Sequence, residues 1–188
     1  LVTLKAGTIV RISAYVGDFN GRPDLKLENL EPLTDAERAD PAIMGRLTPV
    51  SQHDPIKMKA ELLGIVSRIP HAQLRATVES VLAEHGDRFY EAVAALGMHH
   101  AFRHGLLEHT LRMAKCAEAL LPPYPKVAPS LAVAGTVLHD VGKIQEYSRL
   151  EPGMAKASFT RAGNLHGHLV LGAFLIRQHG TKVGLEAS

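Results

Sequence analysis

The 188-residue sequence has no tryptophan, a single cysteine and only 5% aromatic residues. One cysteine excludes a disulfide framework and a cysteine-rich zinc module, and it is typical of a protein from the reducing cytosol. No apolar run approaches the roughly 18 residues of a membrane span, and the first residues, LVTLKAGTIVRIS, do not have the pattern of a signal peptide. The sequence therefore predicts a cytoplasmic protein without a membrane partner.

Charge is nearly balanced, with a formal net charge of +2, which is too small to identify a nucleic-acid partner. The overall composition, 46% hydrophobic and 21% charged, is that of an ordinary globular protein and excludes a disordered chain. The charge is uneven, because residues 101–188 carry ten Lys and Arg against six Asp and Glu. An anionic ligand is therefore expected to meet this half of the chain.

Histidine is what the sequence has in abundance. Seven of the eleven histidines fall between residues 99 and 168. Histidine is the commonest metal ligand and a frequent acid–base group, so this clustering is the first indication of function.

A β-hairpin is predicted at the start of the chain, where apolar and polar residues alternate over 8–33 around an Asn20-Gly21 turn signal. Because an isolated hairpin is marginal in water, we expect it to belong to a larger sheet. The chain also opens on Leu1 rather than Met, so we expect it to begin inside a longer protein. Residues 34–53 have no clear period and are interpreted as a linker with one helical turn.

From Asp54 onward the apolar residues recur with the period of an α-helix, which predicts about six helices. The expected segments are 54–69, about 74–86, 87–97, 106–121, a helix from about 129 through 138, and 160–180, with proline or glycine at most of the ends. The predicted fold is therefore mainly α. A helical bundle over residues 51–188 follows a partial β segment over residues 1–50.

His109 lies on an apolar stripe of its predicted helix at about 100° per residue. The other members of the stripe are Leu106, Met113, Cys116 and Leu120. A buried imidazole needs a polar partner, so His109 is either a core residue bonded to a backbone carbonyl or a functional ligand. Cys116 is assigned to the core.

The motif His139-Asp140-x-Gly142-Lys143 favours the functional alternative. Adjacent helical residues point about 100° apart, so both can reach one ion only at a helix end or in a groove, and Gly142 is expected to loosen such an end. An imidazole nitrogen with a carboxylate oxygen is a typical donor set for Zn²⁺, Mn²⁺, Fe or Ni²⁺. Together with His109, the motif predicts a metal between two helices.

The other histidines are assigned by position. His166 and His168 point about 200° apart on one helix, so only one can face the site, and His168 is chosen as the inward one. His166, His99, His100 and His104 are predicted either to surround the metal ligands or to be structural. Those at helix ends and in the linker are predicted to be solvated, and they are His53, His71 and His85.

Three segments resemble the HD superfamily of metal-dependent phosphohydrolases, and most of all the YhaM-type 3′-5′ exoribonucleases: MHHAFRHGLLEHTLRMA, LHDVGKIQEY and FTRAGNLHGH. The resemblance covers residues 5–178. It implies that His109, His139 and Asp140 are metal ligands and that His168 is an outer or second-metal ligand. It also implies that Asp140 and Lys143 are catalytic, with Lys143 near the scissile phosphate.

The same resemblance implies one or two divalent ions, with Mn²⁺ preferred and Fe, Ni, Zn or Mg as alternatives. In this family an OB-fold, which binds single strands, precedes the HD domain, and the hairpin is similar to its last two strands. Tyr15 and Phe19 would then stack on bases, and Arg22 and Lys26 would contact phosphates.

The sequence departs from the family at two places. His104-Gly105 stands where the family has Gly-Gly, and no Asp follows Asp140, although the family has a later His-His-Gly and a final Asp that completes its metal site. We therefore expect the C-terminal part of the HD domain to be incomplete. Three functions stay open: a 3′-5′ exonuclease on single-stranded RNA or DNA, a nucleotide phosphohydrolase, and a nucleic-acid-binding module with a decayed pocket.

Overall fold

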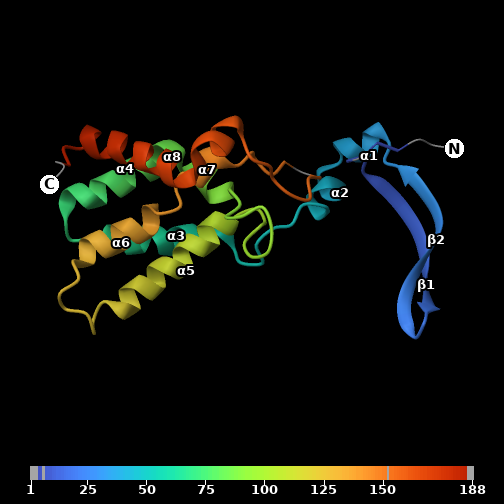
Figure 1. Cartoon of the computed structure of the whole chain (residues 1–188), viewed down its shortest axis with the longest axis horizontal. Helices are drawn as coiled ribbons and strands as arrows, with labels where there is room; N and C mark the ends of the chain where they lie inside the picture. The colour runs from blue at the N-terminus through green and yellow to red at the C-terminus, as the bar shows by residue number, and fades with distance from the viewer. Residues whose placement is uncertain (1–3, 6, 152, 186–188) are drawn as a thin grey trace. The chain divides into compact units, whose positions relative to one another are not determined.

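The computed structural model describes residues 4–5, 7–151 and 153–185. The chain divides into two compact units, Leu1–Leu47 and Thr48–Ser188. An N-terminal two-stranded hairpin is followed by a helical domain, and 53% of the described residues are helical, which confirms the mainly-α fold class (Figure 1). No helix in the described part of the chain is long and apolar enough to cross a membrane.

The first unit contains the predicted hairpin, formed by the antiparallel strands β1 (Val10–Phe19) and β2 (Arg22–Pro32). Asn20 and Gly21 have φ angles of 55° and 75°, the left-handed values that a tight hairpin turn requires. The backbone N–H of Gly21 also donates to the Asp18 carboxylate at 3.0 Å. Among the described residues the sheet has these two strands, so the rest of an OB-fold stays a prediction.

The predicted linker is partly wrong, because two short helices follow the hairpin. They are α1 (Asp35–Ala39) and α2 (Pro41–Arg46). Thr34 and Glu37 form a reciprocal capping box at the start of α1, and Asp40 caps α2. The Thr-x-x-Glu pattern that marks such a box is readable in the sequence, and the caps explain why so short a segment is helical.

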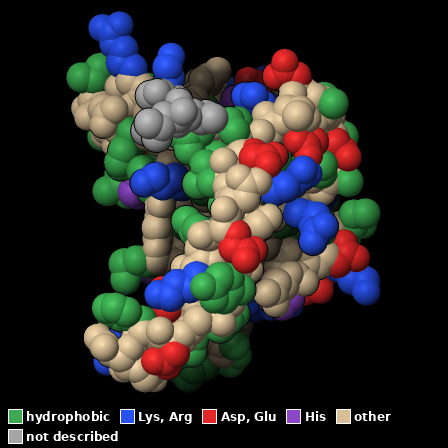
Figure 2. Space-filling view, turned by 90° about the vertical axis from the view of Figure 1, so that its right-hand side faces the viewer, with side chains coloured by type: hydrophobic (Ala, Val, Ile, Leu, Met, Phe, Trp, Pro, Cys, Tyr) green, Lys and Arg blue, Asp and Glu red, His purple; other side chains and the backbone are tan. Residues whose placement is uncertain are grey.

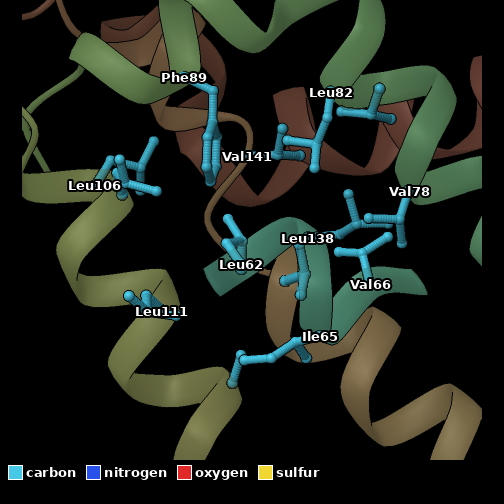
Figure 3. Packing of buried hydrophobic residues seen from close by; sticks show 14 of the residues in the cluster. Leu62, Ile65, Val66, Val78, Leu82, Phe89, Leu106, Leu111, Leu138 and Val141 are labelled. Carbon is cyan, nitrogen blue, oxygen red and sulfur yellow. The ribbon is translucent and has the colours of Figure 1, made fainter. Parts of the chain in front are cut away.

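The second unit is a helical domain of α3 (Pro55–Ser67), α4 (Ala72–Glu91), α5 (Gly105–Leu120), α6 (Pro129–Leu138), α7 (Lys143–Glu146) and α8 (Arg161–Lys182). Its core is built from the apolar faces of these helices (Figure 3). Leu62 of α3, Val78 of α4 and Val137 of α6 are each fully buried. The apolar helical period predicted for residues 54–69 is confirmed, because Met58, Leu62, Ile65 and Val66 of α3 and Ile69 just after it are all buried.

Helix α4 corrects the prediction of two helices separated at Gly86 and Asp87. It continues without a break to Glu91. A glycine inside a helix costs only about 1 kcal/mol, and burial outweighs that cost here. Leu82, Gly86 and Phe89 share one buried face at helical spacing, and Phe89 is only 1% exposed.

Helix α8 begins as predicted, because the Thr160 hydroxyl accepts the Gly163 N–H at 2.9 Å. However, Gly167 has a φ of 68° and a ψ of 162°, so the helix is interrupted there. Positions before and after Gly167 therefore do not share one helical wheel. Leu165, three residues before His168, is accordingly 68% exposed.

Surface charge is mixed in sign on the face that Figure 2 displays. Lys and Arg side chains lie among Asp and Glu side chains there, with hydrophobic side chains between them (Figure 2). Ion pairs in the helical domain also put opposite charges side by side, such as Arg68 with Glu118 at 2.9 Å and Lys115 with Glu61. Overall composition is therefore a poor guide to where an anionic ligand binds, and local clusters have to be considered instead.

Candidate metal centre

Three of the predicted ligands converge at the ends of two helices. His109 comes from α5, His139 ends α6, and Asp140 begins the turn that leads to α7. The Nε2 atom of His109 lies 3.3 Å from Nε2 of His139 and 3.4 Å from Oδ2 of Asp140. Nε2 of His139 lies 3.2 Å from the same oxygen. Ligand atoms held about 2.1 Å from one tetrahedral ion are about 3.3–3.4 Å apart, so these separations suit a shared metal.

The hydrogen bond at the back of the His139 ring fixes its orientation. Its Nδ1 lies 2.7 Å from the carbonyl oxygen of Thr136, which can only accept. Nδ1 must therefore carry the proton, and the lone pair of the neutral ring is on Nε2, toward His109 and Asp140. This is the tautomer that a metal ligand requires.

His168 enters the same cluster from α8. Its Nε2 lies 3.5 Å from Oδ1 of Asp140, the carboxylate oxygen that does not face His109. Its Nδ1 and its backbone N–H both contact Oε1 of Glu146, at 3.0 and 2.9 Å. A carboxylate behind an imidazole holds the ring in place, so Glu146 supports His168 as a ligand.

Gly142 allows α8 to approach this closely. A Cβ atom on Gly142 would lie 2.0 Å from the carbonyl oxygen of His168 and 2.5 Å from the backbone nitrogen of Gly172. The residue is in ordinary right-handed conformation. We predicted that Gly142 loosens the helix end, but its role in the structure is the close packing that brings His168 to Asp140.

Lys143 lies beside the cluster as the first residue of α7, with its Nζ 2.7 Å from Oδ2 of Asp140. Its side chain is mostly buried, at 14% exposure. Burial acts to raise the pKa of Asp140, but hydrogen bonds from His139 and Lys143 outweigh it and hold that pKa well below its usual range. Asp140 is therefore an anion that is shared between neighbouring donors.

The two imidazoles of the cluster differ in basicity. Burial lowers the pKa of His109, although the Asp140 charge opposes this. The hydrogen bond to Asp140 raises the pKa of His139. Because a metal ion competes with protons for ligand atoms, metal binding here should weaken as the pH falls. Two imidazole nitrogens and carboxylate oxygens fit Mn²⁺, Zn²⁺, Fe or Ni²⁺ as the bound ion.

The other predicted histidines have different positions. The ring of His100 lies 5.5 Å from that of His109, and His99 is exposed beside His100. His104 bonds the carbonyl of Tyr90 at 2.7 Å and has a φ of 68°. Glycine is favoured at such a φ, so His104 occupies a backbone conformation that is uncommon for a residue with a side chain. His166 is exposed.

Two buried carboxylates were not predicted. Glu146 supports His168, and Glu108 contacts Ser51 at 2.7 Å and Arg112 at 2.6 Å. Glu108 also has His53 and His100 within 3.8 Å. His53 is 57% exposed, which agrees with its prediction as a solvated histidine. Their position in the sequence could have identified these two glutamates, since each lies within one helical turn of a predicted site residue.

The predicted stripe of α5 is wrong in part. Leu106 is buried, but Met113 and Leu120 are 42% and 59% exposed, and Cys116 is exposed rather than in the core. The buried residues are Leu106, Leu107, Leu111 and Ala114, together with polar Glu108 and Thr110. His109 therefore lies at the edge of the buried face, which is where a ligand can reach both the core and solvent.

The four hairpin residues assigned to nucleic acid share one face of the sheet. Tyr15 pairs with Lys26 and Phe19 pairs with Arg22, and side chains paired across two strands lie on the same side. Tyr15 and Phe19 are four residues apart on β1, which puts both pairs on that side. They are 57% and 63% exposed, and Lys26 Nζ lies 5.7 Å from the Phe19 ring centroid.

Residues 106–187 match the HD domain family. The chain is also similar to proteins named 3′-5′ exoribonuclease YhaM. It is 27% identical to the protein of Bacillus pumilus over 98% of this chain and 57% of that one. It is 29% identical to the protein of Halalkalibacterium halodurans over 98% of this chain and 55% of that one. No solved structure shows significant similarity. The chain spans about half the length of the curated relatives it matches.

Proposed function

We propose that this chain, whose residues 106–187 match the HD domain family, is a metal-dependent phosphohydrolase that shortens single-stranded RNA from its 3′ end. The observation that carries the proposal is the convergence of His109, His139 and Asp140 within 3.2–3.4 Å, with a partly buried lysine beside them. The alternatives for the substrate are single-stranded DNA and free nucleotides.

The proposed metal ligands are His109, His139, Asp140 and His168. A divalent ion bound there supplies a Lewis acid for the phosphate and lowers the pKa of water toward neutrality. The protein holds the donor atoms in place before substrate arrives. Thr136 keeps the lone pair of His139 on Nε2, and Glu146 orients His168. Asp140 presents one oxygen to each side, because Oδ2 faces His109 and His139 while Oδ1 faces His168.

We assign Lys143 to the phosphate. An ammonium group repels a metal cation and attracts a phosphate oxygen, so a lysine beside a metal cluster is suited to binding the substrate rather than the metal. Its side chain is packed in the domain and contacts Asp140, which limits where the charge can point. A positive charge positioned in this way stabilises the negative charge that builds up on a phosphate during hydrolysis.

The RNA substrate is inferred from two features. The relatives are named 3′-5′ exoribonucleases, although their identity to this chain is 27–29%. The hairpin also presents two exposed aromatic rings and two cations on one face, a combination that binds single strands by stacking and by phosphate contacts.

The test uses purified protein with single-stranded RNA labelled at its 5′ end and Mn²⁺ in the buffer. We expect a ladder of products that shorten stepwise from the 3′ end, with rates that rise from dinucleotides to oligomers of about ten residues as stacking contacts accumulate. The variant His139→Asn/Asp140→Asn should lose this activity to below about a thousandth of the wild type, because it removes two metal ligands.

A matched control, Lys126→Met, changes an exposed residue outside the cluster and should retain full activity. Equal turnover of free nucleotides and oligomers would instead favour the nucleotide phosphohydrolase. Binding of RNA without any hydrolysis would favour the binding module with a decayed pocket. Hydrolysis that is equally fast in the double variant would contradict the proposed site.

A further inference from the structure

A second cluster of two histidines and one carboxylate lies elsewhere in the helical domain. Glu84 and His85 come from α4, and His179 comes from the α8 segment that packs along α4 (Figure 1). Nε2 of His179 lies 3.3 Å from Nε2 of His85 and 4.0 Å from Oε2 of Glu84. Nε2 of His85 lies 3.7 Å from the other oxygen of Glu84.

This cluster is separate from the first one. His179 follows His168 by eleven residues on the regular part of α8, after the interruption at Gly167. A rise of 1.5 Å per residue puts their Cα atoms about 16 Å apart. None of the three residues has a role in the proposed hydrolysis. His85 was predicted to be a solvated histidine, but only 24% of its side chain is exposed.

The His179 ring is arranged as a ligand would be. It is completely buried, at 0% exposure, although histidine is polar. The Ser80 hydroxyl lies 2.8 Å from its Nδ1, so the ring can carry its proton there and keep a lone pair on Nε2. Burial also lowers its pKa, which favours the neutral form that a metal requires. Nε2 points at His85 and Glu84, which are both partly open to solvent.

We propose that Glu84, His85 and His179 form a second metal site, selective for Zn²⁺, that ties α8 to α4. The donor set of two imidazoles and one carboxylate is one that zinc uses, with a further position left for water. The separation of 3.3 Å between the two nitrogens is what two ligands about 2.0–2.1 Å from a tetrahedral ion require. The carboxylate lies slightly farther out, on a half-exposed side chain that can rotate inward.

Lys182 competes with a metal ion for the carboxylate of Glu84. Its Nζ lies 3.3 Å from Oε2 of Glu84, so the ammonium group occupies the carboxylate that the metal would use. Lys182 lies on the surface, with 63% of its side chain exposed. A metal ion must displace this cation, so removing it should strengthen metal binding. If His85 and His179 only form a hydrogen bond with each other, removing Lys182 should not create or strengthen metal binding.

The experiment measures Zn²⁺ binding by calorimetry, and Co²⁺ binding by visible absorption, in protein carrying His139→Asn/Asp140→Asn, so that the first cluster does not contribute. We expect one equivalent of Zn²⁺ and a tetrahedral Co²⁺ spectrum. His85→Gln should reduce the affinity at least a hundredfold, because the His85 ring, 24% exposed, supplies one of three ligands. Lys182→Met should increase the affinity several-fold, and Glu79→Gln, an exposed change on the same helix, should not alter it.

Thermal unfolding provides a second readout that does not depend on the buried His179. Zn²⁺ should raise the Tm of the His139→Asn/Asp140→Asn protein, because a ligand that binds only the folded state stabilises it, and should not do so after His85→Gln. The proposal is overturned if the His139→Asn/Asp140→Asn protein binds no Zn²⁺, or if His85→Gln and Lys182→Met leave the affinity unchanged. Its failure would not affect the proposed hydrolase, because the two sites share no residue.

Discussion

The two histidine–carboxylate clusters of the helical domain have nearly the same donors and very different surroundings. In each, two imidazole Nε2 atoms lie 3.3 Å apart beside a carboxylate. In the first, Asp140 is buried, and the partly buried Lys143 is beside it. In the second, the carboxylate of Glu84 is 46% exposed, and its partner, Lys182, is a surface residue.

The different surroundings of the two clusters distinguish the features needed to bind a metal from the features needed for hydrolysis. Donor atoms at suitable distances are sufficient to hold an ion in either place. Only the first cluster also has a positive charge held rigidly in the protein, and a fourth donor, His168, supported by its own carboxylate. We therefore expect phosphate chemistry at the first cluster and a structural role at the second.

Removing the charge of Lys143 is expected to have the largest effect on the difference between the two clusters. Lys143→Met should lower kcat on the order of a hundredfold, as expected for the loss of one electrostatic stabiliser, while the metal content stays the same. The measurement is kcat on labelled RNA together with elemental analysis of the same sample. Full activity in this variant would reduce Lys143 to a charge that neutralises Asp140.

Removing the charge of Glu146, which contacts the His168 ring, should have the next largest effect. Glu146→Gln keeps the size of the side chain but removes its charge, so the His168 ring should be held less firmly. Metal affinity or turnover should fall about 10–100-fold, which is usual for the loss of such a partner. Titration with Mn²⁺ while activity is followed measures both quantities. An unchanged Mn²⁺ requirement would contradict the assignment of His168 as a ligand.

The hairpin gives the smallest effect and should act on the RNA alone. Tyr15→Ala or Phe19→Ala should weaken the binding of oligomers by about 1–3 kcal/mol for each lost stacking contact and flatten the rise of rate with RNA length. Leu25→Ala is a matched control because it pairs with Val16 on the other face. If Leu25→Ala has the same effect as Tyr15→Ala, the face that we assign to nucleic acid is wrong.

The sequence predicted those parts of the fold and site that depend on local spacing. The stripe of α3, the turn at Asn20-Gly21 and the meeting of His109, His139 and Asp140 all follow from periodicity or from a motif. The parts that depend on tertiary contact were not predicted. Helix α4 continues beyond Gly86, because Phe89 is buried in the core. Glu146 contacts the His168 ring only because α8 packs closely against Gly142.

The exposed Cys116 shows that the sequence pattern of a helix does not reveal which of its faces is buried. A helical wheel gives the relative directions of residues on a helix, but not which direction the rest of the protein covers. The wheel placed Cys116 beside His109 correctly, and both lie toward the outer side of α5. The buried side is centred instead on Leu107, Leu111 and Ala114.

The central claim is that His109, His139 and Asp140 hold a divalent metal ion. Anomalous X-ray scattering from crystals of the protein grown with Mn²⁺ tests it most directly, because it locates the ion without reference to activity. The account predicts an anomalous peak within bonding distance of both Nε2 atoms and the Asp140 carboxylate. Mn²⁺-dependent hydrolysis by a protein whose crystals show no peak at these three residues would contradict it.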